Sequence, residues 1–324
     1  MQQLARSLRS LLFFGGWALV LGMASCGGGG GGGGGGTALP FAAVGTAAPP
    51  SDPPAAPATP PATPPATPPA TPTPPPPAEE PAEPPPATSR VATDTIASAK
   101  TGATYPLEIY LPASYDGGSA SYPIIYAMDA DGIFNPPDTR FSNLKNILDK
   151  RSTQAILVGI GGTSRREQDY TMPGATAYHD FLTQELVPFV EARYRADPGK
   201  RMLTGLSLSG SMAGIALFLE GAANNLTFSY FLSFEGAYAH QGPEYENLEQ
   251  QMHDALNGRP LPATLILTRC DNPDECNFAP VDSMFNRLRG RGYQGLAVEE
   301  TTYSTTHTET DIPSFADAVA RLLP

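Results

Sequence analysis

The stretch MLTGLSLSGSM, residues 202–212, places a serine where the chain bends most sharply. An apolar, strand-like beginning runs into a cluster of Gly and Ser, and the helical pattern AGIALFLE follows at once. A sharp bend between a strand and a helix pushes a serine hydroxyl out at the top of a sheet, where it can attack a substrate. The pattern therefore predicts Ser207 as a nucleophile.

The residues around this bend fit the same prediction. Backbone crowding requires small residues two positions before the serine and two or three after it, and Gly205, Ser209 and Gly210 stand there. The helix that begins after the bend offers free N–H groups and a positive dipole end. We therefore expect the N–H of Leu208 to stabilise an oxyanion next to Ser207. Ser209 is the alternative nucleophile, but that reading frame loses the glycine on the strand side.

A serine nucleophile needs a base, and the chain has four histidines. His253 stands in the amphipathic segment EYENLEQQMHDAL, and His179 begins another helical pattern. His240 follows the strand-like SYFLSF, where it lines a pocket or caps a loop. His307 differs from these three because it lies in STTHTET, between the last expected strand and the final expected helix.

An acidic loop follows the strand-like run ATLILT. It reads TRCDNPDECNF and holds Asp271, Asp274 and Glu275 between Cys270 and Cys276. The N-terminal segment, described below, predicts export, and an even pair of cysteines in an exported protein is typical of a disulfide. Two free thiols or a metal pair are the alternatives, and a metal site would need further His or Cys nearby. A disulfide here would stiffen the loop, and a rigid carboxylate is what orients a catalytic histidine. Solvated loop acids are the alternative interpretation.

The elements that must position these residues alternate along the chain. Short apolar, β-branched runs begin at residues 106, 122, 154, 201, 229, 263 and 295. Helical patterns lie between many of them, such as AYHDFLTQELVPFVEARY over 177–194. Strands that alternate with helices predict a mostly parallel sheet covered on both faces. Such sheets bind ligands at the carboxyl ends of their strands.

Several segments together resemble a known family. YPLEIYLPASYDGGSASYPIIYAMDADGIF, SRREQDYTMP, the elbow GLSLSG and the late STTH, in this order, are similar to the putative-esterase branch of the alpha/beta hydrolases. That branch includes esterase D and the periplasmic siderophore esterases, and the resemblance covers nearly all of residues 90–324. It implies a three-layer α/β fold and a cofactor-free serine hydrolase that cleaves carboxylic esters of small molecules.

The resemblance also implies roles for single residues. An alpha/beta hydrolase carries its base on the loop that holds His307, after the nucleophile and the acid in chain order. The usual spacing after the strand favours Asp274 as the acid, with Asp271 close behind. The backbone N–H of Asp131, in DADGIF, takes the second oxyanion position. Arg166, Asp169 and Tyr170 fall in the segment that borders the active-site mouth.

Two departures from the family pattern accompany this resemblance. Ser209 replaces the second glycine of G-x-S-x-G, and the position of the acid is not fixed by the motif. Some siderophore esterases are thought to work with a Ser–His pair alone. An acyltransferase of the same fold is an alternative function, and a non-catalytic binding module on a hydrolase scaffold is another.

The charge of the chain excludes one class of partner. The 324 residues carry a formal net charge of −12, and residues 1–89 contribute two arginines against four acids, which leaves −10 for the remainder. Nucleic-acid binding needs clustered Lys and Arg, so an acidic domain without a basic stripe argues against it.

The first 89 residues predict a targeting signal followed by a linker. MQQLARSLRS, an apolar core and MASC resemble a bacterial lipoprotein signal over residues 1–25, which implies acylation of Cys26. Gly27 rather than Asp follows, which is similar to the outer-membrane address of Gram-negative lipoproteins. Residues 26–89 are rich in Gly and Pro and are expected to form a disordered linker. The globular esterase domain is expected over residues 90–324, held at the cell envelope by its lipid anchor alone.

Overall fold

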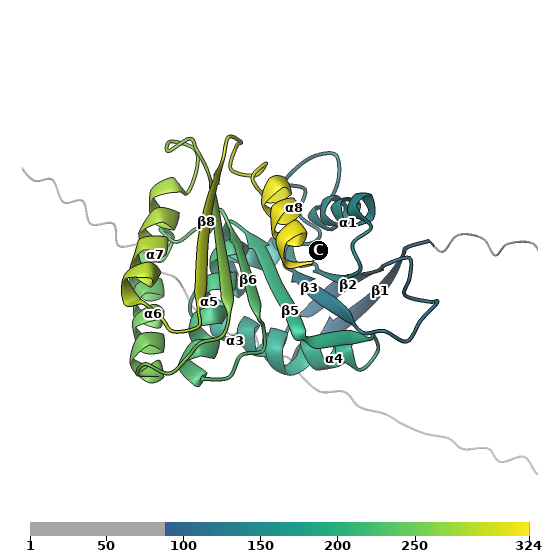
Figure 1. Ribbon diagram of the computed structural model, residues 1–324, viewed down its shortest axis with the longest axis horizontal. Helices are drawn as coiled ribbons and strands as arrows, with labels where there is room; N and C mark the ends of the chain where they lie inside the picture. The colour runs from purple at the N-terminus through teal and green to yellow at the C-terminus, as the bar shows by residue number, and fades with distance from the viewer. Residues whose placement is uncertain (1–87, 324) are drawn as a thin grey trace, which may run out of the picture. The chain divides into compact units, whose positions relative to one another are not determined.

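The computed structural model describes residues 88–323, and these form an eight-stranded sheet with helices on both faces (Figure 1). The strands are β1 (Arg90–Ala97), β2 (Thr104–Leu111), β3 (Tyr122–Ala127), β4 (Ile156–Ile160), β5 (Ala196–Leu206), β6 (Tyr230–Phe234), β7 (Thr264–Cys270) and β8 (Ala297–Tyr303). Their order in the sheet is β1-β2-β4-β3-β5-β6-β7-β8. The pairs β1–β2 and β2–β4 are antiparallel and the others are parallel. The predicted α/β class with a mostly parallel sheet is therefore confirmed.

The helices divide between the two faces of the sheet. The long ones are α1 (Arg140–Arg151), α5 (Leu208–Ala223), α6 (Gly242–Leu256), α7 (Phe278–Arg291) and α8 (Asp311–Leu322). Shorter ones are the 3₁₀ turn η1 (Thr163–Arg165), α2 (Arg166–Asp169), α3 (Gly174–Asp180), the π segment η2 (Phe181–Leu186) and α4 (Val187–Glu191). The larger core joins the sheet to helices α3 to α7, and the smaller core joins it to α1 and α8. Figure 1 shows α1 and α8 together, and the two helices pack against each other.

Two elements differ from the sequence prediction. The helix predicted over 177–194 is a run of α3, a π segment and α4 that ends at Glu191. Pro188 lacks the N–H that a regular α-helix would use, and a wider π turn just before it accommodates this loss. The edge strand β1 was not predicted, because only one of its eight residues, Ile96, is buried and an alternating pattern is absent.

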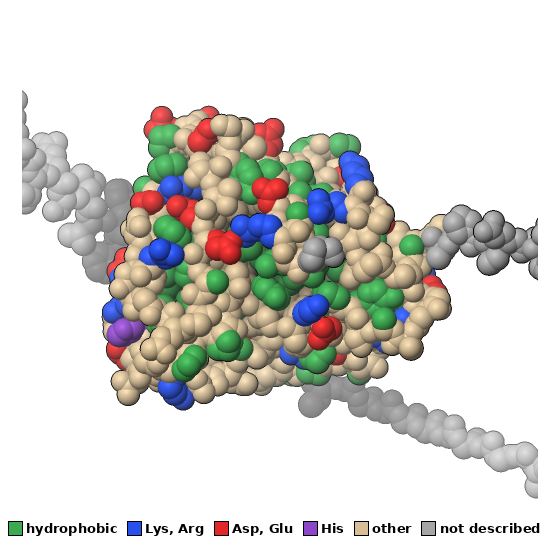
Figure 2. All heavy atoms as spheres, viewed as in Figure 1, with side chains coloured by type: hydrophobic (Ala, Val, Ile, Leu, Met, Phe, Trp, Pro, Cys, Tyr) green, Lys and Arg blue, Asp and Glu red, His purple; other side chains and the backbone are tan. Residues whose placement is uncertain are grey.

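The parallel strands end at one edge of the sheet, where the loops that carry the candidate site lie. Acidic side chains gather along this edge above β7 and β8 in Figure 2, and on the face shown Lys and Arg are scattered among other side chains. Within residues 88–323 no helix is both long and apolar enough to cross a membrane. The predicted signal peptide, Cys26 and nearly all of the predicted linker lie outside the described residues.

Candidate active site

Ser207 stands between β5 and α5, on a bend that only strained backbone can make. Its φ of 63° and ψ of −117° lie outside the regions that L-residues prefer. The N–H of Ser207 donates to the carbonyl of Phe234 at 2.9 Å, and its carbonyl accepts the N–H of Ala237 at 3.1 Å. These two bonds fasten the bend to the loop after β6. Ser207 is partly exposed, whereas every residue from Leu208 to Phe218 in α5 is buried.

The small residues around the bend are required by close backbone contacts. A Cβ on Gly205 would lie 2.2 Å from the carbonyl oxygen of Ser209, and one on Gly210 would lie 2.5 Å from that of Phe234. Neither distance leaves room for a side chain, because the neighbouring atoms are backbone. The elbow predicted from the spacing of small residues is therefore the one that the chain forms.

Ser209 has a structural part in the same bend. Its hydroxyl accepts the N–H of Leu206 at 2.9 Å and lies 3.0 Å from the Leu206 carbonyl, to which it donates. The residue is 0% exposed. A buried hydroxyl with both functions engaged is a poor nucleophile, so the geometry favours Ser207 over Ser209 as the reactive serine.

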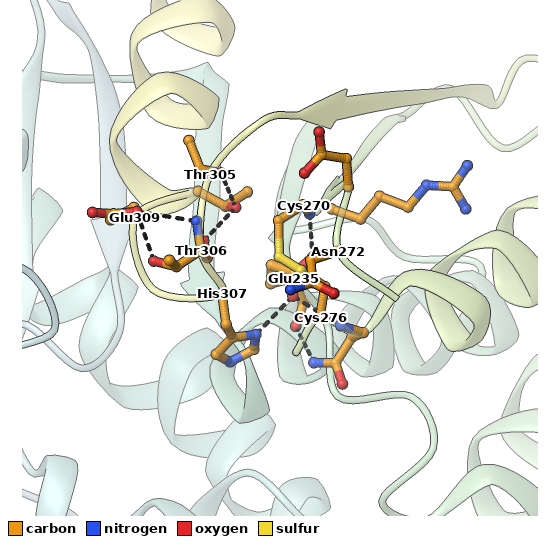
Figure 3. The surroundings of a disulfide bond; sticks show 12 residues. Glu235, Cys270, Asn272, Cys276, Thr305, Thr306, His307 and Glu309 are labelled. Atoms are coloured by element: carbon orange, nitrogen blue, oxygen red, sulfur yellow. Dashed lines mark hydrogen bonds and ion pairs between the residues drawn. A yellow bond between two sulfur atoms is a disulfide. The ribbon is translucent and has the colours of Figure 1, made fainter. Parts of the chain in front are cut away.

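His307 lies on the loop between β8 and α8, which its neighbours hold in a compact turn (Figure 3). Glu309 accepts from both the N–H and the hydroxyl of Thr306, at 3.0 and 2.8 Å, and these bonds lower the pKa of the Glu309 carboxyl. The hydroxyls of Thr305 and Thr310 are 2.7 Å apart. The imidazole of His307 is 29% exposed, and its Nδ1 lies 2.6 Å from Oε2 of Glu235.

Glu235, directly after β6, is the carboxylate that contacts His307. Its side chain is 0% exposed and its φ is 48°. Figure 3 shows it between the imidazole and the loop after β7. A carboxylate on Nδ1 fixes the ring orientation and leaves Nε2 to act on a substrate or a serine. Because Glu235 follows Phe234, whose carbonyl binds Ser207, one short segment joins the elbow to the His–Glu pair.

The prediction of Asp274 as the acid that contacts His307 is corrected by this geometry. Asp274, Asp271 and Glu275 are all exposed. The backbone N–H of Asp274 donates to Asn272 at 3.1 Å, and the Asp271 carboxylate accepts from Ser304. The loop instead supplies donors to Glu235. The signal that could have found Glu235 is its place in SYFLSFEG, where an acid directly follows a buried strand beside β5.

Three strained residues mark this edge of the sheet. Of the six non-glycine residues with positive φ within residues 88–323, three end the helices α1, α5 and α6, namely Ser152, Asn224 and Asn257. The other three, Asp129, Ser207 and Glu235, follow the adjacent strands β3, β5 and β6. Backbone strain that is not a helix cap concentrates at functional sites. The site therefore extends across the ends of three neighbouring strands.

The loop after β3 forms the side of the site that was predicted to complete the oxyanion hole. The carboxylate of Asp131 accepts the N–H of Gly162 and the N–H and hydroxyl of Thr163 at 2.6–3.1 Å. Partial burial opposes ionisation, but these hydrogen bonds outweigh it and lower the pKa of Asp131. The bonds hold the loop against the end of β4. The role of the Asp131 N–H itself stays a prediction.

Arg166 connects that loop with the elbow. Its guanidinium donates to Asp129 at 3.0 Å and to the carbonyl of Leu206, the residue before Ser207, at 3.1 Å. Burial raises the pKa of Asp129 although Arg166 opposes that shift. Of the three residues expected at the mouth, only Arg166 is partly exposed, because Asp169 and Tyr170 are buried. Those two belong to the support of the site rather than to its rim.

The other three histidines have partners elsewhere. Nε2 of His179 lies 3.2 Å from Oε1 of the buried Glu220. Nε2 of His240 lies 3.4 Å from Oε2 of Glu167, and Nδ1 of His253 lies 3.4 Å from Oδ1 of Asp254. His240 and Glu167 are both exposed, so this pair lies on the surface. Among the histidines of residues 88–323, His307 is the one whose carboxylate partner, Glu235, directly follows Phe234, the residue whose carbonyl binds the N–H of Ser207.

Cys270 and Cys276 are bonded to each other, as predicted, with Cα atoms 5.6 Å apart. Their sulfur atoms lie within 4.8 Å of each other and of a Glu235 oxygen, which is close enough to consider a metal site. The bond between the sulfurs removes both thiolates as ligands, and one carboxylate oxygen does not make a site. The group is therefore a disulfide beside a carboxylate.

The chain is similar in part to known proteins. The family described as "Putative esterase" matches residues 98–230. The ferri-bacillibactin esterase BesA of Bacillus subtilis is 26% identical over 145 residues, which cover 36% of this chain and 48% of BesA. The uncharacterized protein YbbA of the same organism is 24% identical over 161 residues, 45% of this chain and 60% of YbbA. The matches thus span about half to three fifths of these relatives.

Solved structures share the fold over a larger part of the chain. An IroE-like serine hydrolase from Shewanella oneidensis has a TM-score of 0.62 and 21% identity, over 72% of this chain and 80% of that one. The siderophore hydrolase EstA of Aspergillus nidulans has a TM-score of 0.58 and 18% identity, over 72% and 93%. At these identities the likeness shows the fold, and it is the fold that the sequence predicts.

Proposed function

We propose that this chain, which matches the family described as "Putative esterase" over residues 98–230 and has an alpha/beta-hydrolase fold, is a serine hydrolase that cleaves carboxylic esters through an acyl-enzyme at Ser207. One observation carries the proposal. A strained elbow presents Ser207 beside the segment that holds Glu235, and Glu235 binds the imidazole of His307 at 2.6 Å.

The proposed reaction uses these groups in turn. The Ser207 hydroxyl attacks the ester carbonyl carbon, and Nε2 of His307 takes its proton. His307 then gives this proton to the departing alkoxide, so the alcohol leaves and the acyl group stays on Ser207. Water, deprotonated by the same imidazole, attacks the acyl-enzyme and releases the acid. Glu235 accepts a hydrogen bond from Nδ1 throughout and stabilises the imidazolium.

The proposed oxyanion hole has two donors. The N–H of Leu208 is the first of α5, so it has no acceptor within the helix and lies at the positive end of the helix dipole. The second donor is the backbone N–H of Asp131, on the loop that Gly162 and Thr163 hold in place. Together they would stabilise the negative oxygen of the tetrahedral intermediate.

We propose a small-molecule ester as the substrate, of the class that siderophore esterases cleave, because such relatives share the fold and part of the sequence. A cavity of about 480 Å³ is lined by Asp131, the proposed second oxyanion donor. Asp94 and Glu108 also line this cavity. Burial and the charge of Asp131 raise the pKa of Glu108. Carboxylates there favour a neutral or cationic substrate group over an anionic one.

Hydrolysis of p-nitrophenyl butyrate by purified protein tests the proposal. Ser207→Ala should lower kcat by several orders of magnitude, because the acyl-enzyme cannot form. Ser119→Ala, an exposed serine in the loop after β2, is the matched control and should keep the wild-type rate. Wild-type activity in the Ser207→Ala variant would overturn the assignment. Absence of turnover in the wild type, for this ester and for trilactone siderophores alike, would favour a binding module on a hydrolase scaffold.

A further inference from the structure

The loop that carries the disulfide encloses the carboxylate of Glu235. The N–H of Cys270 donates to Oε1 at 2.6 Å, and the N–H of Asn277 donates to Oε2 at 2.9 Å. The side-chain amide of Asn277 donates to the Glu235 carbonyl at 2.7 Å. Figure 3 shows the disulfide directly beside this carboxylate. Three hydrogen bonds from the two ends of one loop therefore determine where Glu235 lies.

The disulfide joins the two ends that supply these donors. Cys270 carries the first donor itself, and Cys276 precedes Asn277, which carries the other two. The sulfur bridge thus fixes the spacing between the donor to Oε1 and the donor to Oε2. A glutamate held on both oxygens presents Oε2 to Nδ1 of His307 in one orientation.

The position of the Glu235 carboxylate depends on these donors because few other groups interact with its charge. Its side chain is fully buried, and within residues 88–323 its ion pair is with His307, with neither Lys nor Arg in contact. A buried carboxylate requires hydrogen bonds to stay charged and ordered. Main-chain N–H groups of the loop supply them here.

The alternative role of the disulfide, stabilisation of the whole fold, fits the structure less well. The bridge closes a loop with a sequence separation of only six residues, and stabilisation through chain entropy is smaller for short loops than for long ones. The residues between the cysteines are mostly exposed and add little to the core. The buried contacts of the loop are instead those to Glu235.

We propose that the Cys270–Cys276 disulfide positions Glu235 against His307, so that esterase activity depends on the oxidised state of this bond. The inference rests on the proposed function only for its kinetic consequence, since the geometry of the Glu235–His307 pair can be observed without a substrate. Cys270, Cys276 and Asn277 are positioning residues, because they act on the reaction through Glu235.

Reduction of the folded protein tests the proposal. A dithiol such as dithiothreitol supplies two electrons and two protons, leaves two cysteine thiols and becomes a cyclic disulfide. Mass spectrometry after alkylation measures the extent of reduction, and circular dichroism verifies that the fold persists. With p-nitrophenyl butyrate we expect kcat to fall about 10- to 100-fold and KM to stay within twofold, because a misplaced catalytic group costs about that much. The Cys270→Ser/Cys276→Ser variant should show the same loss without reductant.

Three further experiments separate positioning of Glu235 from a general loosening of the fold. In Glu235→Gln the reductant should cost less than a further twofold, since the group that the disulfide positions is already lost. The far-downfield proton resonance of the His307 Nδ1–H, bonded to a carboxylate, should weaken on reduction of the wild type. Asn277→Ala, which keeps the disulfide, should lower kcat and weaken this resonance, each to a smaller degree than reduction does.

Full kcat and an unchanged resonance in the fully reduced, folded protein would overturn the proposal. An equal loss in Glu235→Gln on reduction would also overturn it, because the effect would then not pass through Glu235. Should the wild type prove inactive toward esters, the proposed function fails, while the response of the His307 resonance to reduction still decides the positioning role. If the double cysteine variant does not fold, reduction of the folded wild type gives the answer alone.

Discussion

In the proposed mechanism, the buried Glu235 has the role that the sequence assigns to an acid of the loop after β7. The acid partner of a catalytic histidine has to be held rigidly, and Glu235 meets this need with hydrogen bonds to both carboxylate oxygens. Asp274 is exposed and does not meet it. The loop of the predicted acid therefore contributes by supporting the acid of the neighbouring strand.

Exchange of each carboxylate for its amide discriminates between these two residues. Glu235→Gln should lower kcat for p-nitrophenyl butyrate by roughly 10³- to 10⁴-fold, because an amide on Nδ1 permits the wrong imidazole tautomer. Asp274→Asn should change it less than twofold. The kcat of both variants, each with a wild-type circular dichroism spectrum, checks this. An equal loss in Asp274→Asn would return the role to the loop after β7.

The contrast between Ser207 and Glu235 shows what the sequence can reveal at this scale. Ser207 is predictable because the backbone demands small residues at fixed spacing, and Gly205 and Gly210 record that demand locally. Glu235 is not, because the ends of β6 and β7 both lie beside the site and each is followed by an acid. Only the folded loop shows which acid is buried and which faces solvent.

At the scale of elements, a buried ion pair joins the ends of two strands to the helices α1 and α8. Arg140 in α1 binds Asp311, the first residue of α8, through two bonds of 2.9 and 2.8 Å. The same guanidinium donates to the carbonyl of Met128 and to the hydroxyl of Thr204 at 2.8 and 3.1 Å. Both partners of the ion pair are at most 1% exposed. Arg140 thus fixes the ends of β3 and β5 relative to the helix that follows His307.

Removal of one partner should destabilise the protein strongly. Asp311→Ala leaves a buried arginine without its counter-charge, and we expect a loss of about 3–5 kcal/mol in the free energy of unfolding. Urea unfolding of residues 88–324 measures it. The double variant Arg140→Met/Asp311→Leu should recover part of the loss, because it removes the unpaired charge. A loss below about 1 kcal/mol in Asp311→Ala would contradict this role.

The contact between α6 and α7 should make stability depend on pH. Glu249 in α6 is fully buried and accepts from Arg287 at 2.5 Å and Arg291 at 3.0 Å, both in α7, and from Tyr293. Burial alone would raise the pKa of Glu249, but Arg291, Tyr293 and Arg287 together lower it. A carboxyl whose pKa is lowered by folding stabilises the protein above its unfolded pKa of about 4.3, and this contribution is lost as the pH falls.

Glu249→Gln tests that pH dependence. At pH 7 the variant should be less stable by about 1–2 kcal/mol, a modest figure because both arginines are partly exposed. That corresponds to a Tm lower by roughly 2–8 °C. The difference in Tm from the wild type should shrink as the pH is lowered from 6 to 3. A difference that stays constant over this range would show that the Glu249 charge is not the source.

At the scale of the whole molecule, the sheet brings residues from distant parts of the chain to one edge. The strand order places β3, β5, β6 and β7 side by side, so the loops that hold Asp131, Ser207 and Glu235 and the end of β7 at Cys270 become neighbours. The alternation of strands and helices predicts this architecture, because both kinds of element can be recognised from the periodicity of apolar residues alone. The edge strand β1 escapes prediction because one face of it gains almost no burial. The order of the strands in the sheet, and the contacts between residues of different loops, can be known only from the folded structure.

We also propose that the domain is anchored to the bacterial cell envelope, in the outer membrane, through a lipid on Cys26. Acyl chains on a processed cysteine would hold the protein at a membrane, while the Gly- and Pro-rich residues 26–89 give the domain reach. Cys26→Ser should move the protein from the membrane fraction to the soluble fraction of cells, with the kcat of the purified protein unchanged. Retention of this variant in the membrane fraction would contradict the anchor.

Labelling with a fluorophosphonate tests the central claim most directly, because this reagent reacts much faster with a serine that a base activates than with an ordinary hydroxyl. Mass spectrometry of the labelled peptide should place the phosphonyl group on Ser207, and labelling should be abolished in Ser207→Ala and slowed strongly in Glu235→Gln. Labelling at Ser209 or at another serine, or an intact wild-type protein that does not react at all, would contradict the account.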